Sequence, residues 1–303
     1  MGTAILRGDQ RAWLHDEGHA AGVFHTYDAL DVGHGFSARK VHVFLPRGYA
    51  DGQRYSVIYL HDGDTSFWRG GVGHKTWDVA GVLSVLSGRI ADVIAVAVHP
   101  QDRNAEYTHV DWAHGQRSYG RLIDHADYMA DGIKGFIDAN YPTAPAPAEN
   151  AIVGSSHGGL AAFWTATRRP DAFGNAGCLS PSFFSGLDSL VRGPRPTPLA
   201  TSALVAGAAQ VLADPALRPR LWMCWGMRRD GGDHNAVVEA LAARRGAEMA
   251  DLLVNTYGYR RGDGQTATPP DADLFVAVEP SHGHDEDAWR IRFAWMMRAL
   301  FPR

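Results

Sequence analysis

Cysteine and surplus positive charge are both scarce in this chain of 303 residues. Its two cysteines, Cys178 and Cys224, cannot build a disulfide framework or a four-cysteine zinc site, and their apolar surroundings predict buried thiols. The 29 basic residues are scattered and are outnumbered by 33 acidic ones, which gives a net charge of -4. Nucleic-acid binding needs a basic patch or stripe, so nucleic acid is not an expected partner.

Long hydrophobic runs are absent as well. Residues 1–16 are interrupted by Arg7, Asp9, Arg11 and Asp16 and lack the apolar core of a signal peptide. No later stretch reaches the roughly 20 apolar residues that span a bilayer. Unless a leader has been removed, we expect a cytoplasmic protein with no membrane partner, and homo-oligomerisation stays open.

What the chain does have is an alternation of apolar runs and helical patterns, with enough hydrophobic residues (45%) for a sizeable core. Several runs are continuously apolar, as in strands that are buried on both faces. Strands are expected at 23–30, 40–45, 56–60, 93–98, 151–154, 174–179, 221–225 and 274–278. Helices are expected at 122–137, 159–169, 201–212, 236–245 and 285–300. This alternation predicts an α/β fold with a mostly parallel sheet covered on both faces, in a single domain over residues 1–303.

Two segments break the alternation. Residues 142–149 are rich in proline and alanine and predict a short surface connection. Residues 182–220 include the proline-rich stretch 193–198. The second segment is either a lid or wall of a substrate cleft, or a plain excursion of the surface.

The most informative motif is Gly154-Ser155-Ser156-His157-Gly158, which follows an expected strand and precedes an expected helix. In a G-x-S-x-G nucleophile elbow the serine occupies a strained turn, where side chains two residues away on either side would collide with neighbouring backbone. Gly154 and Gly158 remove those side chains. Only Ser156 has a glycine at both positions, so we expect it to be the nucleophile of a serine hydrolase, although a plain Gly/Ser turn would use the same residues.

A serine hydroxyl is a weak nucleophile at neutral pH and needs a neighbouring base, which a carboxylate orients. In an α/β-hydrolase the chain order is Ser, then Asp or Glu, then His. His282 and His284 stand between the last expected strand and the last expected helix, in a loop that can reach back over the nucleophile. We choose His284 as the base and expect His282 to cap or hydrogen-bond near the helix start.

The carboxylate should follow the strand at 221–225, where Asp230 and Asp233 compete. Asp233 stands just before the expected helix at 236–245 and suits the role of an N-terminal cap. Asp230 stands closer to the end of the strand. We therefore prefer Asp230 as the acid, with an ordinary Asp-Gly turn as the alternative interpretation.

Acyl transfer also needs N–H donors for the developing oxyanion. One should be the amide of His157, which follows the nucleophile at a helix N-terminus, and the other should come from the turn after an earlier strand. In that turn we favour the amide of Asp64 over that of Gly63. We expect His61 and Asp62 to shape the turn rather than to act in catalysis.

Further signals come from segments spread in order over about residues 20 to 302. They are Tyr59–Gly63, Arg103–Thr108, Gly154–Gly159, Cys178–Phe183 and Gly283–Asp285 with Trp289. Together they resemble the putative esterase family, the esterase D and enterochelin-esterase-like branch of the α/β-hydrolases, which also includes feruloyl esterases and mycolyltransferases. The resemblance implies a serine esterase of the α/β-hydrolase fold with Ser156 and His284 as catalytic residues, while the family's acid is an Asp or Glu in a variable loop.

The chain departs from that family at two histidines. His157 stands where the family often has Met, and His282-Gly283-His284 stands where Gly-Gly-His is common. Neither change removes a catalytic group. Each adds an imidazole near the expected cleft, where it would affect the choice of substrate.

We therefore expect a serine carboxylesterase that forms an acyl-enzyme and needs no cofactor or metal. The expected catalytic and oxyanion-binding residues are Ser156, His284, Asp230, Asp64 and His157. Two alternatives stay open. In a metal-dependent hydrolase, His282 and His284 with the acidic residues 285–287 would hold the ion. The other alternative is a non-catalytic member of the same fold.

The substrate is expected to be a small-molecule ester, and its identity is open between simple acyl, aryl and siderophore-lactone esters. Several aromatic residues stand in loops that should border the cleft, namely Phe67, Trp68, Trp77, Trp112, Phe183 and Phe184. They indicate a bulky or aromatic acyl or alcohol group, although burial in the core is the more common fate of such residues.

Overall fold

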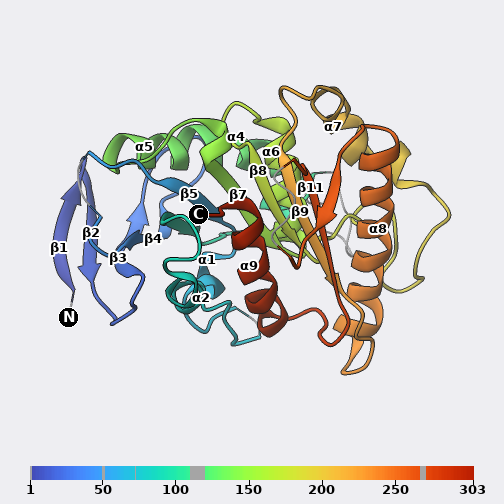
Figure 1. Ribbon diagram of the computed structural model, residues 1–303, viewed down its shortest axis with the longest axis horizontal. Helices are drawn as coiled ribbons and strands as arrows, with labels where there is room; N and C mark the ends of the chain where they lie inside the picture. Colours follow the sequence, from blue (N-terminus) through green and yellow to red (C-terminus); the bar gives the residue numbers. More distant parts are fainter. Residues whose placement is uncertain (1, 50–51, 72, 110–119, 267–270) are drawn as a thin grey trace.

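The strands are β1 (Thr3–Arg7), β2 (Gln10–His15), β3 (Gly22–Leu30), β4 (Arg39–Pro46), β5 (Ser56–Leu60), β6 (Val93–Val98), β7 (Asn150–Ser155), β8 (Asn175–Leu179), β9 (Arg220–Gly226), β10 (Arg261–Asp263) and β11 (Leu274–Glu279). The computed structural model describes residues 2–49, 52–71, 73–109, 120–266 and 271–303. Within them the eleven strands form one sheet in the order β1-β2-β3-β4-β6-β5-β7-β8-β9-β11-β10 (Figure 1). Neighbours from β6 to β10 in that order are parallel, and the pairs from β1 to β6 are antiparallel.

Helices cover both faces of this sheet. On one face lie α2 (Val79–Leu86) and α9 (Glu286–Leu300), whose apolar side chains form one core cluster with the strands. The other face carries α4 (Leu122–Asp127), the π-helix η1 (Tyr128–Lys134), α5 (Gly135–Asn140), α6 (His157–Arg168), α7 (Ala203–Ala213) and α8 (Ala240–Asn255). Shorter elements are α1 (Gly63–Ser66), α3 (Arg103–Glu106), the 3₁₀ turns η2 (Pro147–Glu149) and η3 (Leu199–Thr201), and the π-helix η4 (His234–Glu239) that leads into α8.

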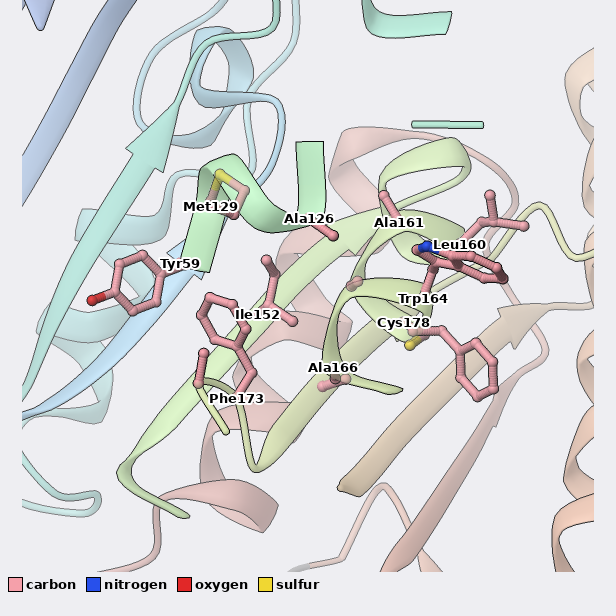
Figure 2. Close-up of a cluster of buried hydrophobic side chains, with 14 of the residues drawn as sticks. Tyr59, Ala126, Met129, Ile152, Leu160, Ala161, Trp164, Ala166, Phe173 and Cys178 are labelled. Carbon is pink, nitrogen blue, oxygen red and sulfur yellow. The ribbon is translucent and has the colours of Figure 1, made fainter. Parts of the chain in front are cut away.

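The two core clusters follow from the alternation of side chains along each buried strand. In β7, Ile152 belongs to the cluster under α4 to α8, whereas Ala151 and Val153 belong to the cluster under α2 and α9. Figure 2 shows Ile152 between Met129 and Phe173. Because both faces are covered, every residue of β7 is buried, and the centre of the strand appears in the sequence as a continuous apolar run.

The eight expected strands are all present, and the expected α/β fold with helices on both faces of a mostly parallel sheet is confirmed. The strands β1, β2 and β10 were not expected. The first is largely exposed and the last has three residues, so neither shows a buried apolar run. The helix expected at 236–245 is longer and continues to Asn255.

Both cysteines are buried free thiols, as the sequence predicts. Burial raises the pKa of the Cys224 thiol to about 12, so it stays protonated at neutral pH. In the parts of the chain that the structure describes, no helix is both long and apolar enough to cross a membrane.

The segment 182–220 is tied to α8 by a buried ion pair. The Arg245 guanidinium contacts the Asp188 carboxylate through two hydrogen bonds of 2.7 and 2.8 Å, and both side chains are almost fully buried. Arg245 also donates to the carbonyl oxygen of Thr197 at 3.1 Å. The proline-rich part of the segment is therefore held against the helix.

Candidate active site

Ser156 lies in a strained turn between β7 and α6. Its backbone has φ 55° and ψ −120°, a conformation that non-glycine residues rarely adopt. A Cβ on Gly154 would lie 2.4 Å from the carbonyl carbon of Gly158, so the turn closes only with glycine at 154. The strand, turn and helix that the G-x-S-x-G motif requires are all present.

His284 contacts Glu239, a residue outside the loop in which the sequence predicts the acid. Nδ1 of His284 lies 2.6 Å from Oε2 of Glu239, and both side chains are buried. Glu239 is the last residue of η4, a π-helical turn of a kind often found at functional sites. Asn235, four residues earlier, accepts a hydrogen bond from the backbone N–H of His284 at 2.9 Å. One helical segment therefore fixes both the backbone and the ring of His284.

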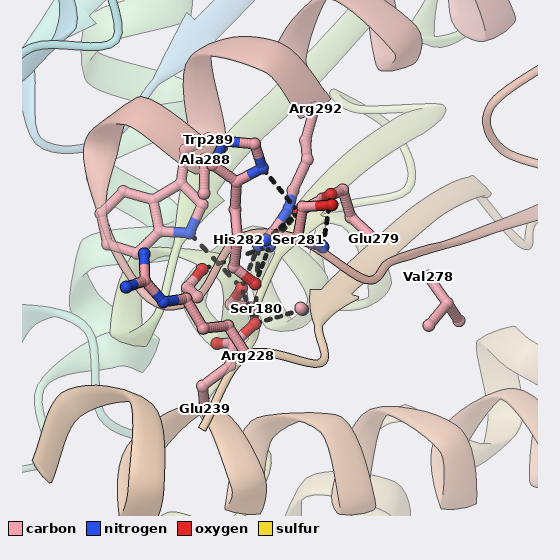
Figure 3. Close-up of polar contacts among 12 residues, drawn as sticks. Ser180, Arg228, Glu239, Val278, Glu279, Ser281, His282, Ala288, Trp289 and Arg292 are labelled. Atoms are coloured by element: carbon pink, nitrogen blue, oxygen red, sulfur yellow. Dashed lines mark hydrogen bonds and ion pairs between the residues drawn. The ribbon is translucent and has the colours of Figure 1, made fainter. Parts of the chain in front are cut away.

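The second oxygen of Glu239 lies in a buried polar network at the ends of the strands (Figure 3). Oε1 accepts hydrogen bonds from the Ser180 hydroxyl, at 3.0 Å, and from the backbone N–H of Gly226, and it lies 3.5 Å from the Arg292 guanidinium. Burial raises the pKa of the Glu239 carboxyl, but the hydrogen bond from His284 and the charge of Arg292 outweigh it and bring that pKa below its ordinary value. Glu239 is therefore ionised at neutral pH.

Among the described residues, neither aspartate proposed from the sequence makes a hydrogen bond or ion pair with His284, whose carboxylate partner is Glu239. The Asp230 side chain is 78% exposed and pairs with Arg228 at 2.8 Å. Asp233 is exposed at the start of η4. The expected pairing of Asp230 with His284 is therefore not found in the structure. The loop after β9 turns into solvent, and the carboxylate that contacts the histidine comes from the helical segment that follows.

His282 contacts a different carboxylate from His284. Its Nδ1 lies 3.0 Å from Oε2 of Glu279 at the end of β11, and the same oxygen accepts the backbone N–H of His282 at 2.6 Å. The two histidines are thus turned toward separate carboxylates. Within the described ranges no group of three or more His, Cys, Asp or Glu side chains is placed to hold a metal ion.

The loop after β8 joins the serine to the histidine–glutamate pair. The backbone N–H of Ser156 donates to the carbonyl oxygen of Leu179 at the end of β8. The backbone N–H of Ser182 donates to the carbonyl oxygen of Ser156. Both distances are 2.9 Å. In the same loop Ser180 binds Glu239. Among the described residues no hydrogen bond joins Ser156 directly to His284; the two side chains flank this shared loop.

The Ser156 hydroxyl has a second serine beside it. Its Oγ lies 3.2 Å from Oγ of Ser182, which lies 3.3 Å from Nδ1 of His157. Burial lowers the pKa of His157 to about 3, so this imidazole is neutral at physiological pH. The neutral ring and the Ser182 hydroxyl form one wall of the site around the serine.

The turn that should supply an oxyanion donor packs against the elbow. Asp62 has a left-handed conformation, with φ 55°, and its carboxylate binds the Arg103 guanidinium at 2.6 and 2.8 Å. A Cβ on Gly158 would lie 3.2 Å from that carboxylate. Asp64 follows in α1 and His157 begins α6, so both amides belong to first helical turns, where N–H groups have no intrahelical acceptor. Asp62 shapes the turn, as expected.

Most of the aromatic residues expected at the cleft lie in the core instead. Phe67, Trp77, Phe183 and Phe184 are buried. Trp68 is partly exposed, and its indole N–H donates to Glu17 at 2.8 Å. Trp112 lies outside the described residues.

Comparison with solved structures gives the fold. The chain is similar to an IroE-like serine hydrolase from Shewanella oneidensis, with a TM-score of 0.63 and 18% identity over 91% of this chain and 79% of that one. Enterochelin esterase from Shigella flexneri gives a TM-score of 0.61 and 16% identity over 95% of this chain and 59% of that one. The ferulic acid esterase AmCE1/Fae1A from Anaeromyces mucronatus gives 0.59 and 17% over 94% and 92%. These likenesses confirm the α/β-hydrolase fold.

Comparison of the sequence with protein families gives the family as well as the fold. The family model described as putative esterase matches residues 37–300, which include all of the parallel strands and every candidate site residue. No curated protein sequence matches the chain.

Proposed function

The chain belongs to the putative esterase family, and from this membership and the geometry of the site we propose that it is a serine carboxylesterase that works through an acyl-enzyme. One observation carries the serine mechanism. A buried histidine–carboxylate pair, His284 with Glu239, lies across one loop from a serine in a nucleophile elbow. The chain order of Ser156, Glu239 and His284 is that of α/β-hydrolases.

In the proposed mechanism Ser156 Oγ attacks the ester carbonyl carbon. Because ionised Glu239 can only accept, Nδ1 of His284 carries the proton of their hydrogen bond, which leaves Nε2 free to accept the serine proton. The imidazolium then gives that proton to the alcohol oxygen as the ester bond breaks. Water repeats both steps on the acyl-enzyme and releases the acid.

The acid in this proposal is Glu239 and not Asp230. The amides of Asp64 and His157 bind the oxyanion of the tetrahedral intermediate, as the sequence predicts. Their support is the packing of the Asp62 turn against Gly158, which brings the starts of α1 and α6 together.

The substrate class in this proposal is a small-molecule ester. The structural neighbours named for ferulic acid and enterochelin hydrolysis make aryl esters and siderophore lactones reasonable compounds to test. The segment 182–220 serves as a fixed wall of the site rather than as a moving lid, because the Asp188–Arg245 pair holds it against α8.

A comparison of two adjacent serines tests the mechanism. Ser156→Ala should lower kcat for p-nitrophenyl esters by about 10⁴-fold or more and abolish labelling by a fluorophosphonate probe. Ser155→Ala is the matched control, because it removes the same atom one residue earlier and should keep both signals. Unchanged turnover by Ser156→Ala would contradict the serine mechanism.

A further inference from the structure

A hollow of about 250 Å³ lies on the surface between the segment after α1 and the first turn of α9. It is lined by Arg69, Lys75, Thr76, Asp287 and Arg290. Three of these five side chains are cationic and one is anionic. The mechanism proposed above uses none of them.

One wall of the hollow is attached to the turn that carries Asp64. The hydroxyl of Thr76 donates to the carbonyl oxygen of Thr65 at 2.9 Å. Gly70 lies so close to Asp64 that a Cβ on the glycine would meet the Asp64 carbonyl oxygen at 1.9 Å. Arg69, Lys75 and Thr76 therefore stand on a segment folded back onto the candidate oxyanion turn.

The opposite wall begins beside the candidate base. Asp287 follows His284 by three residues, so their Cα atoms are at most about 11 Å apart. Lys75 crosses from one wall to the other, because its Nζ lies 3.1 Å from Asp285 and 2.8 Å from Asp287. The hollow is thus on the rim of the candidate active site.

Only one of the three cations that line the hollow forms an ion pair among the described residues. Lys75 is paired with two carboxylates, Asp285 and Asp287. Arg69 and Arg290 are exposed, and among the described residues neither has an acidic partner within ion-pair distance. Two guanidinium groups therefore face the hollow with no ion-pair partner among the described residues.

The size and charge of the hollow fit one functional group rather than a whole ligand. Pockets for complete small molecules usually measure about 300–1,000 Å³, so about 250 Å³ suits an extension of a substrate whose ester lies at Ser156. Arginine binds carboxylates through two parallel hydrogen bonds. Asp287 on the same wall would repel a dianionic phosphate more strongly than a single carboxylate.

We propose that this hollow is a substrate subsite for a carboxylate, and that the enzyme prefers esters whose acyl or alcohol part carries one. Arg69 and Arg290 would bind the carboxylate, and Lys75 would hold the two walls together. This inference rests on the proposed esterase function and narrows its substrate class to acidic esters.

Matched substrate pairs that differ only in charge test the preference. One pair is the mono-4-nitrophenyl ester of glutaric acid and its methyl diester, with the carboxylate on the acyl side. The other is 4-carboxyphenyl butyrate and its methyl ester, with the carboxylate on the alcohol side. In at least one pair the acidic member should have the higher kcat/KM, and the preference should shrink as salt screens the charges.

Variants then assign the preference to the hollow. The double variant Arg69→Gln/Arg290→Gln should lower the acidic-to-neutral ratio of kcat/KM about five- to tenfold, a range set by two partly exposed charge pairs. Arg11→Gln is the control, because Arg11 is an exposed arginine of β2 that does not line the hollow. It should leave the ratio unchanged.

The outcomes separate this inference from the esterase proposal. Equal kcat/KM within both pairs, or a ratio that survives the double variant, would overturn the subsite and leave the esterase intact. If no ester is hydrolysed, the esterase proposal fails, and binding of monomethyl glutarate against dimethyl glutarate to Ser156→Ala, measured by calorimetry, still decides the subsite. Stronger binding of the acid that disappears with the arginines supports it, and equal binding refutes it.

Discussion

Glu239 and His284 are joined by a hydrogen bond of 2.6 Å between Oε2 and Nδ1, although 45 residues of chain separate them. The carboxylate comes from the end of a π-helical turn on one side of the sheet, and the imidazole comes from the loop after β11. The buried carboxylate fixes the tautomer of the histidine. Because an ionised carboxylate can only accept hydrogen bonds, Nδ1 must carry the proton. In the proposed mechanism this contact leaves Nε2 of His284 to accept the proton of Ser156.

Removing the charge of Glu239 should be costly for catalysis. Glu239→Gln keeps the shape of the side chain but presents an amide to Nδ1 and can favour the other tautomer, so kcat should fall about 10²- to 10⁴-fold. Steady-state kinetics with a p-nitrophenyl ester measures the effect.

Asp230→Asn is the matched control, since it neutralises the exposed carboxylate on the preceding loop. Its kcat should stay within about twofold of the starting protein, as for other exposed side chains. A larger fall of kcat in Asp230→Asn than in Glu239→Gln would mean that Asp230, and not Glu239, is the acid.

The Arg103–Asp62 pair should act on kcat rather than on KM. Arg103→Lys loses the two parallel hydrogen bonds that hold Asp62 in its left-handed conformation, and the Asp64 amide follows two residues later. An amide that binds only the oxyanion stabilises the transition state more than the bound substrate. We expect kcat to fall about tenfold or more, with KM changed less than about threefold.

Arg169→Lys controls for the loss of a forked ion pair in general. Arg169 binds Asp131 through two hydrogen bonds of 2.7 Å at the far end of α6 from Ser156. This variant should keep its kcat. An equal fall of kcat in both lysine variants would mean that Arg103 contributes to stability and not to positioning.

Stability should decrease in mild acid. Burial is the main cause that holds the pKa values of several histidines far below 6.5, namely His42 and His157 at about 3 and His25, His61, His99 and His109 at about 4. The unfolded chain binds these protons below pH 6.5, whereas the folded chain does not bind them until pH 3 to 4. The contribution of these neutral histidines to the free energy of unfolding is therefore fully present above about pH 6.5 and is lost as the pH falls toward 4.

Urea denaturation between pH 8 and pH 4.5 measures this loss. Each such histidine adds a slope of about 1.4 kcal/mol per pH unit within the window. His25→Gln should reduce the total slope by about that amount, because His25 is buried. The exposed His34 offers the control His34→Gln, which should leave the slope as it is. A free energy of unfolding that is level from pH 7 to pH 5 would contradict the argument.

The sequence predicts the centre of the fold well and its edges poorly. Strands such as β6 and β7 are buried on both faces, and the resulting apolar runs are visible in the letters alone. The hairpin of β1 and β2 extends the sheet at its edge, where nearly all positions are exposed or partly buried. Such strands are held by backbone pairing, which leaves little trace in composition.

Glu239, the acid of the proposed mechanism, does not stand in the loop after β9, where the sequence predicts a carboxylate. Glu239 instead belongs to a helix whose buried face continues with Ala242, Gly246 and Met249. A carboxylate on such a face is costly unless it is paired, and this was the available signal. Arg292 gives the same signal among the apolar residues of α9. The hollow at Arg69 and Arg290 had no signal, because segments far apart in the chain form it.

The pair of Asp188 and Arg245 has a consequence for loop exchange between relatives of this fold. A donor segment equivalent to 182–199 brings Asp188 with it, but the cation that neutralises this aspartate belongs to α8. Grafted onto a scaffold without that arginine, the segment would carry an unpaired buried carboxylate, at a cost of about 3–5 kcal/mol. The segment and helix α8 therefore have to be exchanged together, and the residue directly before that helix is Glu239.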